Sequence, residues 1–194
     1  MKDDQKLIIE HADQLLQVLN QERHDWLNHF QVIHSYIKLG RYQDGEHYLG
    51  RIIQESQQDS MIARMNCSKL SAYLMTFNAM HKDVALEVEM RNQVDAGQLA
   101  ITHAGFYDVI SKSIELLRSH LLSEQDEHPN LLVTLFQSED HIIANFDLEG
   151  QVSASVAGEV EKLIHDLNGM AKLTSEQLHT NSSWNAEISF PCKM

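Results

Sequence analysis

The chain has 194 residues, a formal net charge of -13 at pH 7, and hydrophobic residues at 43% of its positions. This length allows one domain or two small ones. The acidity disfavours nucleic acid and anionic lipid as partners because both are polyanions, and the longest apolar runs are far too short to cross a bilayer.

Neither the opening stretch of the sequence nor the cysteine pattern indicates secretion. The opening stretch, MKDDQKLIIEH, lacks a basic segment followed by a long apolar one, so we expect a cytoplasmic protein without a membrane anchor. The two cysteines, Cys67 and Cys192, are far apart and form no CxxC pair. A disulfide framework or a zinc knuckle is therefore not expected.

The first predicted element is a long helix that ends near Gly40. Its apolar residues recur in steps of four and three, which is typical of a helix in a bundle. A polar turn, GRYQDG, precedes a second apolar series at helical spacing, so the two helices are predicted to form an antiparallel hairpin. The two series are Ile8, Ala12, Leu15, Leu19, Trp26, Phe30, Ile33 and Ile37, and then Tyr42, Leu49, Ile52 and Ile53.

A hairpin alone cannot bury both sides of such an apolar seam. We therefore predict that two chains pair into a homodimeric four-helix bundle. The alternative is a monomer in which the hairpin packs on the second half of the chain, because seam spacing does not fix the number of chains.

After residue 66 the pattern changes to a mixture of helices and strands. Alternating segments predict strands, and amphipathic segments predict helices, which together indicate an α/β sandwich with a mostly antiparallel sheet. The fold class is thus α+β, with a helical hairpin at 1–66 and an α/β domain at 67–194. In this domain, helices are expected at 68–80, 104–122 and 156–170, and strands at 84–90, 130–136, 141–148, 176–180 and 184–190.

The stretch QERHDWLNHFQ, residues 21–31, interrupts the apolar seam of the first helix. With Trp26 at zero and ~100° per residue, His24, Asn28 and Gln31 lie at about 160°, 200° and 140°, on the side opposite the seam. His24 is therefore predicted to face water on a polar but almost uncharged surface, which would let an acidic partner approach.

An exposed imidazole is mostly neutral at cellular pH and has a ring nitrogen free to attack phosphorus. Asn28, one turn further on, is placed to hydrogen-bond the ring or a phosphoryl oxygen. Arg23 would offset phosphoryl charge, although the wheel puts it nearer the seam. By itself, however, an exposed helical histidine is most often only a solvated residue.

The string RHDWLNHFQ resembles the phosphoacceptor motif R-H-D-W-x-N-x-x-Q of the sporulation initiation phosphotransferase B family. It is more loosely similar to the H-[DE]-x-x-N-x-[LF] motif of citrate/fumarate-type sensor histidine kinases. The resemblance extends to the order of elements, since a helical hairpin precedes a domain similar to the kinase ATP-binding fold.

The resemblance implies that His24 accepts a phosphoryl group from the aspartate of one response regulator and passes it to that of another in sporulation control. The implied site also contains Arg23, Asn28, Asp25 and Gln31. The wheel puts Asp25 at about 260°, away from His24, which favours a role in orientation or helix pairing. Asn20, Gln21, Leu27 and Gln31 are expected to contact the receiver domain, which would itself supply Mg²⁺.

A kinase of this superfamily needs an asparagine-bearing helix for magnesium and glycine-rich loops for the nucleotide. Residues 104–122 contain no asparagine, and the nearest likeness to a glycine box, FDLEGQV, has one glycine. We therefore expect no cofactor bound by this chain and a relay without ATP. The alternatives are an ATP-dependent sensor-type histidine kinase core and a non-catalytic dimeric scaffold that binds response regulators.

Overall fold

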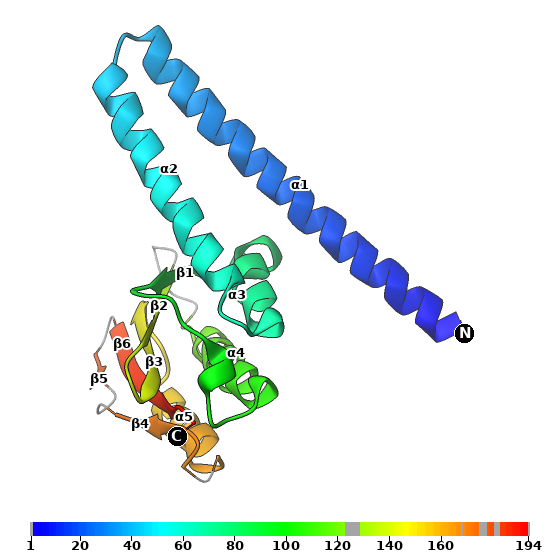
Figure 1. The fold of residues 1–194 in the computed structure, drawn as a ribbon, viewed down its shortest axis with the longest axis vertical. Coiled ribbons are helices and arrows are strands. Elements are labelled where there is room, and N and C mark those ends of the chain that lie inside the picture. The colour runs from blue at the N-terminus through cyan, green and yellow to red at the C-terminus, as the bar shows by residue number, and fades with distance from the viewer. Residues whose placement is uncertain (1, 123–128, 168, 175–177, 181–182, 194) are drawn as a thin grey trace. The chain divides into compact units, whose positions relative to one another are not determined.

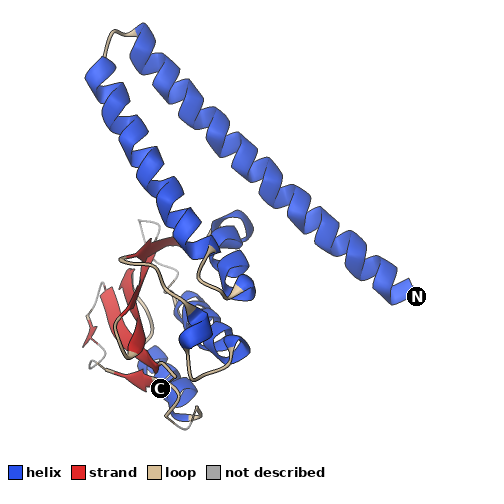
Figure 2. Cartoon of the chain, viewed as in Figure 1, coloured by secondary structure: helices blue, strands red, loops and turns tan. Residues whose placement is uncertain are grey.

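The computed structural model describes residues 2–122, 129–167, 169–174, 178–180 and 183–193. The chain forms two compact units, residues 1–57 and 58–194. Ile62, in the last turn of the second long helix, and Met65 lie in the core of the second unit. Mixed α+β composition is confirmed, with helices first and a sheet with helices after them (Figure 2).

The first unit is built on two long helices that reverse direction at a tight turn (Figure 1). Helix α1 spans Lys2–Lys38 and helix α2 spans Tyr42–Ala63. Gly40 adopts φ +68°, a left-handed conformation that favours glycine at a helix end. A Cβ on Gly45 would lie 3.3 Å from the Tyr36 Cβ, so this glycine permits the helices to approach closely near the turn.

An aromatic cluster joins the two helices beyond the turn. His29 Nδ1 and Tyr48 Oη lie 2.9 Å apart, within hydrogen-bonding distance. The Tyr48 ring also packs against the ring of Tyr36. The Arg51 guanidinium lies 4.9 Å from the centre of the Tyr48 ring. The cluster therefore fixes which side of α1 faces α2.

The predicted seam of α1 is uncovered in the single chain. The exposed fractions of its apolar side chains range from 43% to 59% for Leu15, Leu19, Trp26, Phe30 and Ile37. Rows of exposed large apolar side chains are unusual on a monomer and mark surfaces that another molecule covers.

The second unit is a sheet with three helices on one face. The strand order is β1-β2-β3-β6-β4, and β5 pairs with β6. Strands β1 and β2 are parallel and are joined through α4, while the other pairs are antiparallel. The elements are α3 Ser68–Met80, β1 Ala85–Met90, the short 3-10 helix η1 Ala96–Gln98, α4 His103–Ser119, β2 Asn130–Gln137, β3 His141–Glu149, α5 Ser155–His165, β4 Lys172–Leu173, β5 Leu178–His179 and β6 Ser183–Pro191.

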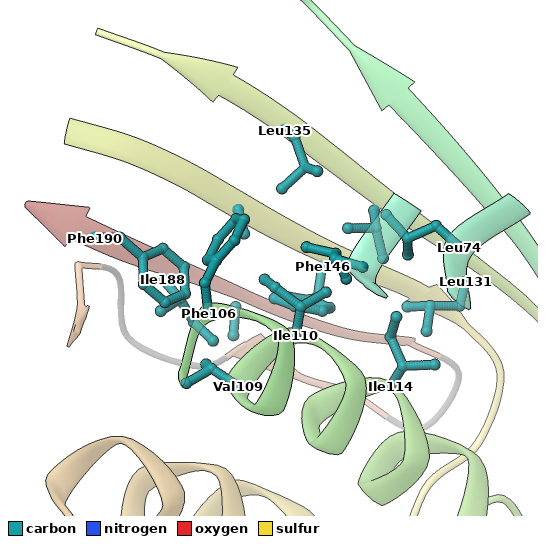
Figure 3. Packing of buried hydrophobic residues seen from close by; sticks show 14 of the residues in the cluster. Leu74, Phe106, Val109, Ile110, Ile114, Leu131, Leu135, Phe146, Ile188 and Phe190 are labelled. Atoms are coloured by element: carbon teal, nitrogen blue, oxygen red, sulfur yellow. The ribbon is translucent and has the colours of Figure 1, made fainter. Parts of the chain in front are cut away.

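The core lies between the sheet and the helices (Figure 3). Alternate residues of β3, such as Ile142 and Phe146, are fully buried, whereas Asp147 and Glu149 point to the other face and are exposed. On α4, Phe106, Ile110 and Ile114 recur at helical spacing and are also buried. Period two in the strands and period 3.6 in the helices therefore direct apolar side chains into the same layer.

The predicted elements of the second unit agree with the structure except at their ends. The helix expected at 156–170 stops at His165, and Gly169 follows with φ +84° in a turn. Strand β4 was not predicted because two residues are too few to show alternation. Of the strand expected at 176–180, Leu178–His179 forms β5, and residues 176 and 177 lie outside the described residues.

Candidate functional site

His24 lies near the middle of α1, and its side chain is 67% exposed. This confirms the prediction that the imidazole faces water. Residues 21–31 contain neither glycine nor proline, so the helix continues without a break on both sides of the ring. The histidine therefore stands on a regular backbone that a second protein can reach.

Two polar side chains approach the same nitrogen of the His24 ring. Asn28 Nδ2 lies 3.2 Å from Nδ1, as predicted from their spacing of four residues. Asp25 Oδ1 also lies 3.2 Å from Nδ1. The prediction that Asp25 points away from His24 was wrong, because a wheel angle gives the direction of the Cα–Cβ bond only and the carboxylate leans toward its neighbour.

The two contacts make opposite demands on the Nδ1 proton. A carboxylate only accepts hydrogen bonds, so Asp25 pairs with a protonated Nδ1. The Asn28 amide nitrogen would donate to an unprotonated Nδ1, and with the amide turned round its oxygen would share the single Nδ1 proton with Asp25. A hydrogen bond to an ionised acceptor is also stronger than a neutral one. The Asp25 contact therefore favours the tautomer in which Nε2 carries the lone pair.

Nε2 is the open side of the ring. Among the residues that the structure describes, the hydrogen bonds of the His24 imidazole are those at Nδ1. A lone pair on a solvent-facing Nε2 is a nucleophile without a competing donor from the described part of the chain.

Gln21 and Arg23 make contacts on α1 that sequence reasoning did not predict. The Gln21 amide donates to both carboxylate oxygens of Asp25, at 2.9 and 3.0 Å. Arg23 Nη2 donates to Asn20 Oδ1 at 3.2 Å, so in this structure the guanidinium is directed to Asn20 and not to the imidazole. Of the expected site residues, the structure thus brings Gln21, Asp25 and Asn28 together around His24.

The remaining expected residues lie on the surface beside the ring. Leu27 is 51% exposed, and Gln31 is also exposed. Gln31 lines a groove of about 420 Å³ together with Asn28, Val32, Ser35, Tyr36 and Leu39. The groove therefore extends along α1 from Asn28, which also contacts His24, toward Leu39.

The second unit shows features that bear on metal and nucleotide binding. In the described part of the chain, no group of three or more His, Cys, Asp or Glu side chains is arranged to hold a metal ion. On α4, the Lys112 ammonium lies 3.4 Å from Asp108 Oδ2 in an exposed ion pair. The backbone of the FDLEGQV stretch is hydrogen-bonded to neighbouring segments. Strand β3 continues to Glu149, and the Leu122 N–H donates to the Gln151 carbonyl at 2.9 Å.

Among the residues that the structure describes, no helix has the length and hydropathy that a membrane span requires.

Two family models together match most of the chain. A family model described as the alpha-helical domain of the sensor kinase SpoOB type matches residues 4–65. A second, described as the C-terminal part of sporulation initiation phosphotransferase B, matches residues 66–191. Sporulation initiation phosphotransferase B of Bacillus subtilis (strain 168) is 20% identical over 139 residues, which is 72% of this chain and 71% of that protein.

Two solved structures of a histidine kinase are among those similar to the chain. The catalytic domain of histidine kinase ThkA has a TM-score of 0.47 and 11% identity, covering 66% of this chain and 95% of that one. ThkA in complex with response regulator protein TrrA also has a TM-score of 0.47 and 11% identity, covering 99% of this chain and 66% of that one.

The helices that carry the exposed His24 thus match an alpha-helical domain of the sensor kinase SpoOB type. Within that class, the chain belongs to the sporulation initiation phosphotransferase B family, whose two models together match it from residue 4 to residue 191.

Proposed function

We propose that the chain is a phosphorelay phosphotransferase in sporulation initiation. It takes a phosphoryl group from the aspartate of one response-regulator receiver domain onto His24 and gives it to the aspartate of a second. Family membership supports phosphotransfer in general. The observation that carries the more specific proposal is the open Nε2 of an exposed His24 whose Nδ1 lies beside a carboxylate.

In the first step, the Nε2 lone pair attacks the phosphorus of an aspartyl phosphate. The N–P bond forms as the bond from phosphorus to the carboxyl oxygen breaks, and that oxygen keeps the electron pair. The ring gains positive charge while Nδ1 retains its proton, and the Asp25 carboxylate 3.2 Å away offsets that charge. The second step is the reverse reaction with another receiver, so nucleotide is not consumed in either step.

The other site residues support this exchange. Asn28 lies beside Nδ1 in this structure, one turn from His24, and would have to turn from that nitrogen to hydrogen-bond a phosphoryl oxygen on Nε2. Arg23 would offset phosphoryl charge after leaving Asn20. Asn20, Gln21, Leu27 and Gln31 border the ring and are proposed to contact the receiver, which would also contribute Mg²⁺ to the transfer.

A second copy of the chain is the proposed cover for the exposed seam of α1. Its apolar residues follow the spacing of a bundle, and they remain open to solvent in the single chain. Pairing of two hairpins into a four-helix bundle would bury the seam and leave His24 on the outside, because the wheel places the ring opposite the seam.

An ATP-dependent kinase core is the alternative activity. The paired FDLEGQV stretch leaves little of the flexible backbone that cradles phosphates, which favours the relay. A non-catalytic scaffold would share the fold but would not take up phosphate.

The test is transfer of label from a receiver domain phosphorylated on its aspartate. Wild-type protein should acquire acid-labile, alkali-stable label on His24, located by mass spectrometry, whereas His24→Ala should acquire none. His47→Ala removes another exposed helical histidine and should be labelled like wild type. A parallel incubation with γ-labelled ATP and no receiver should leave the chain unlabelled.

Equal labelling of wild type and His24→Ala would overturn the assignment of His24. Label from ATP alone would favour the kinase, and a chain that binds phosphorylated receivers without ever acquiring label would favour the scaffold.

A further inference from the structure

Gln21 lies near His24, and its contact with Asp25 has no role in the reaction proposed above. Its amide nitrogen lies within hydrogen-bonding distance of both oxygens of Asp25, four residues further along α1. A Gln–Asp pair at this spacing stabilises a helix surface by only a few tenths of a kcal/mol, so the position of this one beside His24 is its distinguishing feature.

The Gln21 contact is one of those that hold the Asp25 carboxylate. At ~100° per residue, Gln21 is at about 220°, between His24 at about 160° and Asp25 at about 260°. An amide at this position draws the carboxylate away from its own direction and toward the imidazole. In this arrangement Asp25 Oδ1 lies 3.2 Å from His24 Nδ1.

We infer that Gln21 is a positioning residue for phosphoryl transfer, acting through Asp25 on the tautomer of His24. By holding Asp25 against Nδ1, it keeps the proton on that nitrogen and the lone pair on Nε2. This rests on the proposed function, since a tautomer matters only if Nε2 reacts.

The inference differs from the expectation that Gln21 contacts the receiver. A contact residue affects how tightly the receiver binds and therefore changes mainly KM. A positioning residue alters the fraction of His24 that is ready to react, so it changes kcat and the state of the free chain. A free histidine side chain prefers the proton on Nε2, so loss of the Gln21–Asp25–His24 arrangement should be visible without any partner.

The test uses nitrogen NMR of the His24 ring in full-length protein with labelled histidine, at a pH where the ring is neutral. Wild type should show mainly the Nδ1–H tautomer. Gln21→Ala should move the ring toward Nε2–H, and the nearly isosteric Gln21→Glu should do so further because its carboxylate repels Asp25. Gln54→Ala, which removes an exposed glutamine from α2, should leave the spectrum unchanged.

Transfer kinetics give the second measurement. Gln21→Ala should lower kcat for label uptake by about threefold to tenfold, as expected for loss of one hydrogen bond in a positioning chain, with KM nearly constant. An unchanged tautomer in Gln21→Ala, or a change confined to KM, would overturn the inference. If His24 never accepts label, the proposed function fails, whereas the NMR result still shows whether Gln21 sets the tautomer.

Discussion

Arg118, near the end of α4, joins α4 to the segment before β1. Its Nε donates to Asp83 Oδ2 and its Nη1 to Glu115 Oε2, both at 2.7 Å. The Tyr73 hydroxyl on α3 donates to the other oxygen of Glu115 at 3.0 Å. Burial, and then the charge of Glu115, raise the pKa of Tyr73, so the phenol keeps its proton and remains a donor.

The same network makes the stability of the second unit depend on pH. Burial acts to raise the pKa of Asp83, but hydrogen bonds from Arg118 and from its own backbone outweigh it, so the pKa of this carboxyl lies below its ordinary value. A lowered folded-state pKa contributes stability above the unfolded value of about 3.9, and this contribution is lost as the pH falls through the folded pKa.

We therefore predict that acidification from pH 7 toward pH ~3 reduces the free energy of unfolding more steeply in wild type than in Asp83→Asn. Asp83→Asn should be the less stable protein at pH 7, by a modest amount because the carboxylate is half exposed. The free energy of unfolding at each pH is measured by chemical denaturation in a Trp26→Phe background. In that background the fluorescence of Trp184, which is fully buried in the second unit, reports unfolding. The exposed Glu139→Gln should keep the wild-type slope; equal slopes for Asp83→Asn and wild type would contradict the prediction.

At the scale of single residues, the motif and the wheel predicted an exposed His24 with Asn28 beside it. They did not predict the Asp25 contact or its hydrogen bonds with Gln21. Spacing along a helix gives the direction in which a side chain starts, whereas its torsion angles depend on all neighbours at once. The least predictable part of the site was therefore the part that depends on side-chain torsions.

Strand β1 lies at the edge of the sheet, and side-chain amides cover its outer hydrogen-bonding groups. Asn78 on α3 accepts from the Leu86 N–H and donates to the Leu86 carbonyl, at 2.9 and 2.8 Å. The Gln58 side chain accepts from the Met90 N–H at 2.7 Å. An exposed edge invites pairing with another chain, so these contacts protect the strand as well as stabilise it.

A matched pair of asparagines tests this protection. Asn78 and Asn92 each form two hydrogen bonds with one backbone residue, but those of Asn78 are partly buried and those of Asn92 are exposed. Asn78→Ala should lower the free energy of unfolding by about 1–3 kcal/mol, because the Leu86 groups lose partners where water replaces them poorly.

Asn92→Ala should cost less than about 1 kcal/mol, since water can replace its bonds. Chemical denaturation of both variants, with the same Trp184 signal, makes the comparison. Equal losses would show that burial of the Leu86 groups does not matter.

At the scale of elements, alternation and helical spacing located the longer helices and strands of the second unit. Strand order was not readable, because the pairing of β3 with β6 joins residues such as Ala144 and Ile188 that are far apart in the sequence. Local patterns show which face of a strand is buried but do not identify its neighbour.

For the whole molecule, the open seam of α1 predicts association. We expect light scattering at micromolar concentration to give twice the chain mass of 22.2 kDa. A variant with Leu19→Asp and Phe30→Asp should shift to the single-chain mass, because charged groups would be buried at the proposed interface.

Met75→Asp is the control, since Met75 is also an exposed apolar residue, 44% exposed, but lies on α3. It should not change the mass. A wild-type mass of one chain would remove the dimer and leave the seam without its proposed cover.

The seam predicted this association from sequence alone, but a repeat of apolar residues does not give the number of chains. The division into units was also only partly readable. The end of α2 contributes to the second core through Ile62, and no change of composition marks that transition.

The most direct test of the relay is passage of label between two receivers. A first receiver carrying labelled aspartyl phosphate is mixed with catalytic amounts of the chain, and a second receiver is then added without nucleotide. Label should pass through phosphohistidine at His24 to the second receiver with wild type and fail to pass with His24→Ala. Equal passage with both proteins, or an intermediate on another residue, would contradict the account.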